Sequence, residues 1–161
     1  MGFLRRVWTA ARGEAVEPAR TSRDFISALG VPDSLRADTV LATLDIDAAI
    51  NAHERWKDRL MDSLEGRTDD LDPAEVRRSD QGELGRWLHG SGADLLGDQP
   101  AFAVLIARHD YFLAQAALLV ELTQQGQWAR ALQVFHGGYR YGSSQVVLLL
   151  KQLKRGLLNA S

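Results

Sequence analysis

The sequence predicts an all-α protein, an antiparallel four-helix bundle with a short N-terminal helical extension. Apolar residues recur at steps of three and four along three long segments, which is the period of an amphipathic helix. No segment shows the period-two alternation of a half-buried strand. Short connections separate the long segments, and long amphipathic helices joined by short loops are typical of an antiparallel bundle.

Length and composition predict one domain with a sizeable core. The chain has 161 residues, of which 45% are hydrophobic and 25% charged. We place an N-terminal extension, partly helical or flexible, at residues 1–40 and the bundle domain at residues 41–161. Residues 1–12 mix apolar and arginine side chains, as does a helix that lies on a membrane surface. A frayed terminus or a helix packed on its own domain fits the same residues.

The first predicted helix of the bundle begins near Leu44 and is closed by Gly66. Asp72 then starts a new helix as its N-cap, with proline at the first helical position. A further short helix carries Trp87, and Asp80 is its predicted N-cap. The inward stripe of the first long helix is predicted to be Ile46, Ile50, His53, Lys57, Leu60 and Leu64.

The second half of the chain predicts two more helices. One follows Pro100, and residues 124–127, which include Gly126, form the turn after it. The last helix begins near Trp128 and runs through several glycines to the end of the chain. The inward stripe of the former is predicted as Phe102, Ile106, His109, Leu113, Ala116 and Val120, and that of the latter as Leu132, Phe135, Tyr139, Val146, Leu149, Leu150, Leu153 and Leu157.

Charge and composition exclude several classes of function. The formal net charge of -2 gives no attraction to nucleic acid, and the absence of cysteine excludes thiolate catalysis. No apolar run approaches the ~20 residues of a membrane span, and no signal peptide is recognisable, so we expect a cytoplasmic protein. We expect no enzymatic activity, since Ser143 and Ser144 lack the strand–turn–helix elbow of a serine nucleophile.

His53 and His109 are the candidate functional residues, because each occupies an inward position of its own helix. Burial of a neutral imidazole costs free energy unless its ring nitrogens find partners. Two histidines on facing helices are a common metal site in bundle cores. Hydrogen bonds to core neighbours satisfy the same requirement, so spacing alone leaves both interpretations open.

Three segments in order resemble the chemoreceptor zinc-binding family, a cytoplasmic bacterial domain found on chemoreceptors and diguanylate cyclases. Residues 52–57 (AHERWK) are similar to its motif of His, two residues, Trp and Lys. Residues 80–90 (DQGELGRWLHG) resemble its motif of Cys, two residues, Gly, Lys, Trp and Leu. Residues 109–113 (HDYFL) resemble its motif of His, three residues, His. The resemblance covers roughly residues 44–157.

The resemblance implies a zinc site in which half of the ligands are missing. His53 and His109 match two family ligands, whereas Gly82 stands at the cysteine position and Leu113 at the second histidine of the later pair. Asp80 or Glu83 are the substitute ligands that lie near enough in sequence. Structural zinc takes four ligands, so we expect weak zinc binding or none. A switch by oxidation of a metal-bound thiolate is unavailable without cysteine.

The resemblance predicts a stand-alone sensory or regulatory domain of bacterial signalling, in chemotaxis or cyclic-dinucleotide control. It implies action as a homodimer or through a signalling-protein partner. The alternative is a metal-independent structural or adaptor bundle that acts by protein–protein interaction. A third hypothesis is an enzyme in which His53, His109 and a carboxylate surround an open metal.

Overall fold

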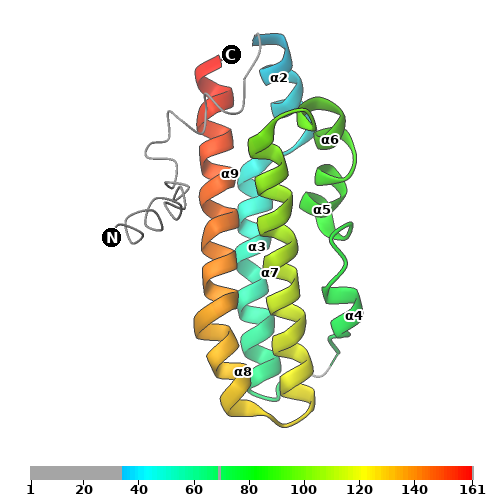
Figure 1. The fold of residues 1–161 in the computed structure, drawn as a ribbon, viewed down its shortest axis with the longest axis vertical. Helices are drawn as coiled ribbons and strands as arrows, with labels where there is room; N and C mark the ends of the chain where they lie inside the picture. The colour runs from blue at the N-terminus through cyan, green and yellow to red at the C-terminus, as the bar shows by residue number, and fades with distance from the viewer. Residues whose placement is uncertain (1–33, 69, 161) are drawn as a thin grey trace, which may run out of the picture.

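The computed structural model describes residues 34–68 and 70–160 of the chain (Figure 1). This part of the chain is all-helical and contains no strand, which confirms the predicted all-α class. Residues 1–33 lie outside the described part, and with them the predicted contact of residues 1–12 with a membrane surface. The predicted boundary between residues 40 and 41 falls within the first described helix, α2 (Ser34–Thr43).

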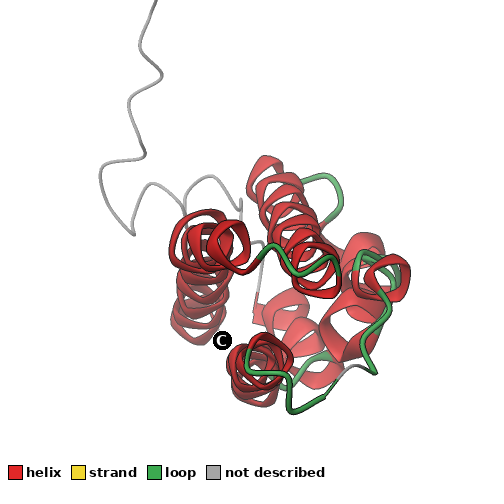
Figure 2. Ribbon diagram, turned by 90° about the horizontal axis from the view of Figure 1, so that it is seen from below, coloured by secondary structure: helices red, strands yellow, loops and turns green. Residues whose placement is uncertain are grey.

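Three long helices run side by side along the molecule (Figure 1). They are α3 (Ile46–Leu64), α7 (Pro100–Gln124) and α9 (Arg140–Ala160), and each packs on the other two. Three short helices lead from the end of α3 back to the start of α7: α4 (Pro73–Val76), α5 (Gly82–Leu88) and α6 (Ser91–Leu96). Seen along its length in Figure 2, the molecule is a ring of helices around a common core.

Local sequence explains both ends of α3 and the start of α4. The Asp45 carboxylate accepts a hydrogen bond from the Ala48 amide at 2.9 Å and caps α3, and Gly66 with φ +69° ends that helix. Asp72 caps α4 through the Ala74 amide at 2.8 Å, as predicted. Any residue other than glycine would be strained at position 66, because residues with a Cβ atom rarely adopt a positive φ.

The predicted cap of α5 is wrong. Gln81 occupies the N-cap position without a side-chain hydrogen bond, while the Asp80 carboxylate contacts the guanidinium of Arg78 at 3.2 Å. Asp80 lies one residue before the N-cap position, so its carboxylate pairs with Arg78 rather than with a backbone amide of α5. The Trp87 indole of α5 instead donates to the Thr43 hydroxyl at 3.0 Å and fixes α5 to the end of α2.

The last helical segment is continuous but changes its winding. It begins as α8 (Trp128–Val134), passes through one π-helical stretch (Phe135–Tyr139) and continues as α9. The Phe135 and Tyr139 rings stack with centroids 5.5 Å apart. A π turn admits an extra residue and therefore rotates the inward face, so Leu132, predicted to face inward, is 46% exposed.

α7 is the central helix, with twelve buried residues among its 25. Among the described residues it is the helix long and apolar enough, by length and composition, to cross a membrane, which differs from the predicted absence of any such segment. The core helix of a packed bundle meets the same criterion, because its contacts with α3, α8 and α9 also select apolar residues. The predicted stripe holds except at Ile106, which is half-buried. On α3, Lys57 is exposed rather than inward.

Candidate functional site

A cavity of about 110 Å³ lies between α3, the α4–α5 region and α7. It brings together the four positions that the family resemblance aligns with zinc ligands, and Glu83 lies on its wall as well. Its wall is otherwise mostly apolar. The four aligned residues are His53, Gly82, His109 and Leu113. We refer to this space as the histidine cavity.

His53 comes from the middle of α3 and is 5% exposed. Its Nε2 atom shares a hydrogen bond with the Ser143 hydroxyl of α9 at 3.1 Å. Burial, with a smaller contribution from the nearby His109, lowers the pKa of His53 to about 4. His53 is therefore neutral near pH 7, with one ring nitrogen engaged across the core.

His109 comes from α7 and is equally buried, but its hydrogen bonding is incomplete. Burial lowers the pKa of His109 to about 4, so this ring is also neutral near pH 7. Within the described part of the chain, its Nδ1 atom is buried and has no hydrogen-bond partner. Buried polar atoms are nearly always paired, so this nitrogen is an exception among the described residues.

Gly82 and Leu113, which the resemblance aligns with two zinc ligands of the family, differ in their surroundings. Gly82 has φ +70°, and a Cβ atom built there meets nothing within 4 Å. Leu113 is 6% exposed and fills part of the apolar wall. Glu83 is exposed at the edge of the cavity. Asp80, the other proposed substitute ligand, is not on the cavity wall and is paired with Arg78, whose guanidinium lowers the pKa of this carboxyl.

The donor atoms present do not fit a structural zinc ion. Among the described residues no three His, Cys, Asp or Glu side chains converge in a group that could hold a metal. Tetrahedral zinc requires four ligands, and one nitrogen of His53 is already bonded to Ser143. The cavity instead offers two neutral imidazoles around a small space, a setting for one or two waters or a loosely held ion.

The sequence prediction missed two residues of this region. Phe112 is 1% exposed and lies 4.1 Å from the His53 ring and 6.4 Å from the His109 ring, centroid to centroid. Ser143 was considered only as a nucleophile. The available signal was Gly142: a Cβ there would lie 3.1 Å from the Phe112 backbone, so glycine allows α9 close enough to α7 for Ser143 to contact His53.

No protein-family model, curated protein or solved structure matches the chain. The chemistry of the histidine cavity and the packing of the helices therefore carry the argument about function.

Proposed function

We propose that this protein is a regulatory helical domain similar to the chemoreceptor zinc-binding family, with a zinc site that has lost two of its four ligands. The single observation that carries the proposal is the composition of the histidine cavity. Two retained histidines and the two positions of the lost ligands line one space, although these four residues come from three different helices, α3, α5 and α7. A chance alignment of short motifs has no reason to converge in this way.

We further propose that the fold is an antiparallel four-helix bundle, as in that family. α3, α7 and the α8–α9 segment supply three of its helices, and the short helices α4–α6 take the place of the fourth. Figure 1 supports this reading, because the chain passes along α3, returns through α4–α6, passes along α7 and returns along α9. A fourth helix broken into pieces still covers the core, since Leu84, Leu88 and Leu96 are buried.

The second candidate is a structural or adaptor bundle that binds a protein partner without metal. The observation in its favour is an exposed aromatic pair: Tyr111 of α7 and Tyr141 of α9 are 38% and 49% exposed and meet edge to face at 6.1 Å. Large exposed aromatics are enriched at protein interfaces. In either case the domain acts by pairing with a second copy or with a signalling protein, which sedimentation of the purified chain tests.

Repair of the site tests the first proposal. The double change Gly82→Cys with Leu113→His adds a thiolate and an imidazole to the wall that His53 and His109 already share. Completed zinc sites contribute on the order of 10 kcal/mol in small peptides, so zinc should raise the melting temperature of this variant by many degrees. The native chain should show a small shift or none. Differential scanning calorimetry with and without zinc measures both.

Two further variants keep this test decisive. Addition of His53→Ala to the repaired chain should abolish the zinc-dependent shift. Gly82 has a positive φ, which strains any other residue, so Glu83→Cys with Leu113→His places the thiolate on ordinary helical backbone one residue later. Absence of a zinc-dependent shift in both repaired variants means that the motif alignment is wrong and the family resemblance fails.

A further inference from the structure

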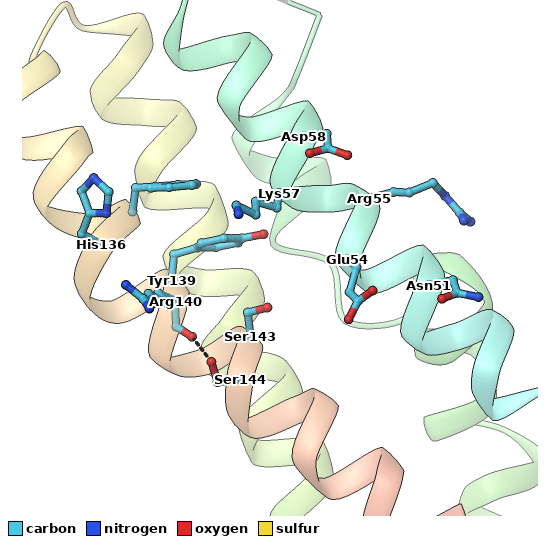
Figure 3. A pocket seen from close by; sticks show the side chains of 11 residues that line it. Asn51, Glu54, Arg55, Lys57, Asp58, His136, Tyr139, Arg140, Ser143 and Ser144 are labelled. Atoms are coloured by element: carbon cyan, nitrogen blue, oxygen red, sulfur yellow. Dashed lines mark hydrogen bonds between the residues drawn. The ribbon is translucent and has the colours of Figure 1, made fainter.

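A second and larger cavity lies on the other side of α3. It is an open groove of about 920 Å³ between α3 and the helix that carries the π-helical stretch and the start of α9 (Figure 3). We call it the polar groove. Asn51, Glu54 and Lys57 line it from α3, and Phe135, Tyr139 and Ser143 line it from the facing helix. Its lining is thus rich in charged and hydrogen-bonding side chains, unlike the histidine cavity.

The Tyr139 hydroxyl is the unexplained group of this groove. Tyr139 is 3% exposed, and its oxygen is buried without a hydrogen-bond partner among the described residues. Burial raises the pKa of Tyr139, with the negative charge of Asp58 adding to the effect, so the hydroxyl keeps its proton and is a donor. The π-helical stretch ends at this residue, and single π turns occur frequently at functional sites.

The groove also holds charges of both signs that the rest of the molecule does not neutralise. Glu54 and Lys57 stand three residues apart on α3, and within the described residues neither has an ion-pair partner. Figure 3 shows both side chains, together with those of Tyr139 and Ser143, directed into the space between the two helices. Asp58 adds one further negative charge to the lining, and Arg55 and Arg140 add two positive charges.

We propose that the polar groove binds a free α-amino acid. The ligand carboxylate accepts from the Tyr139 hydroxyl and pairs with Lys57, while its ammonium group pairs with Glu54. A simple anion or a simple cation satisfies one of these charges and is repelled by the other, whereas a zwitterion satisfies both. Phe135, stacked on the Tyr139 ring, offers an apolar wall for the ligand side chain, so an aromatic or branched aliphatic amino acid fits best.

This site goes beyond the regulatory function proposed above and does not depend on zinc. Ser143 nevertheless belongs to both regions, because it lines the groove and bonds to His53. Ligand binding in the groove therefore acts on a residue that contacts the histidine cavity.

Titration of the full chain with the standard L-amino acids, followed by amide chemical shifts and calorimetry, tests the proposal. L-phenylalanine should bind and shift the amides of α3 and of residues 135–144. Its two halves are matched probes: 3-phenylpropanoate lacks the ammonium group and 2-phenylethylamine lacks the carboxylate. Each should bind at least about tenfold more weakly, since each loses one charge-assisted pair. Equal affinity for the three compounds, or no binding of any amino acid, overturns the proposal.

Variants assign the contacts. Tyr139→Phe should weaken L-phenylalanine binding by about tenfold without unfolding the chain, because the hydroxyl has no partner to lose in the free protein. Tyr141→Phe is the matched control, since that tyrosine is exposed and outside the groove, and it should leave the affinity unchanged. Lys57→Met should weaken 3-phenylpropanoate but not 2-phenylethylamine, and Glu54→Gln should do the reverse. Unchanged affinity in Tyr139→Phe, or shifts confined to other surfaces, contradicts the proposed site.

Discussion

The histidine cavity and the polar groove lie on either side of α3, and each includes a residue with one buried polar atom that has no hydrogen-bond partner in the described part of the chain. In the cavity it is Nδ1 of His109, and in the groove it is the Tyr139 hydroxyl. The cavity is small and its other lining is mostly apolar, whereas the groove is open and carries unpaired charges. The cavity thus contains two imidazoles and few other donor groups, whereas the groove contains a hydroxyl donor and charged side chains of both signs.

Two residues join these regions. Phe112 contacts the His53 ring on one side and lies 5.4 Å from the Tyr139 ring on the other, centroid to centroid. Ser143 shares a hydrogen bond with His53 and also lines the groove. A buried polar group without a hydrogen-bond partner lowers the stability of the folded chain. Substitutions in the cavity and in the groove should therefore change the free energy of unfolding by different amounts.

The greatest loss of stability is expected from truncation of Phe112, whose ring contacts both His53 and Tyr139. Phe112→Ala deletes a ring that is 1% exposed in a packed core, which should lower the free energy of unfolding by about 3–5 kcal/mol. Urea unfolding measures the loss. Tyr111→Ala, next to it but 38% exposed, should cost much less. Similar losses in the two variants contradict the buried position of Phe112 between the His53 and Tyr139 rings.

Acid should destabilise the folded chain through the two histidines of the cavity. The pKa values of His53 and His109 are lowered to about 4 in the folded chain, below the ordinary value of 6.5, so below pH 6.5 the unfolded chain binds more protons. Stability is full above pH 6.5 and is lost as the pH falls toward 4. At pH 5 the loss is about 2 kcal/mol for each histidine.

Urea unfolding at pH 7 and pH 5 measures this dependence. The double variant His53→Gln with His109→Gln is the control, because it removes both titrating groups and should show most of the difference abolished. A native chain that is equally stable at the two pH values contradicts the neutral, buried state of the two rings.

A smaller effect is expected where α9 approaches α7. A Cβ at Gly142 would lie 3.0 Å from the Tyr111 ring and 3.1 Å from the Phe112 backbone, so Gly142→Ala should separate the helices at a cost of about 1–3 kcal/mol. Gly137→Ala is the matched control: its Cβ meets nothing within 4 Å, and alanine should stabilise the helix by about 0.5–1 kcal/mol. Thermal unfolding of both variants separates these directions, and destabilisation by both to the same extent contradicts the close approach.

The smallest change in stability is expected for the Tyr139 hydroxyl of the groove. Tyr139→Phe removes a buried hydroxyl that has no partner, so the free protein should become more stable by about 1 kcal/mol. Tyr141→Phe, on an exposed ring, should leave stability within a few tenths of a kcal/mol. A variant that is more stable yet binds its ligand less well is the pattern expected of a functional residue. Destabilisation by Tyr139→Phe shows that the hydroxyl has a structural partner instead.

The sequence alone predicted the helical class, the caps at Asp72 and Gly66, the turn at Gly126 and the inward positions of both histidines. Each of these depends on residues within one or two turns of one another, where periodicity and backbone preference act directly. It also predicted Gly82 and Leu113 beside the histidines, although only through a family resemblance. The predicted inward position of Leu132 and the predicted role of Asp80 were wrong, because a π turn and a neighbouring arginine act on them.

Only the tertiary structure decided which polar groups meet. Ser143 is 90 residues from His53, and their hydrogen bond requires α9 to pack within reach through Gly142. The sequence predicted Tyr139 only as an inward-facing aromatic residue. Its neighbours along the chain do not show that its hydroxyl is without a hydrogen-bond partner among the described residues. Periodicity states that a residue faces inward but not what it faces, because partners across a core are set by the packing of helices that are distant in sequence.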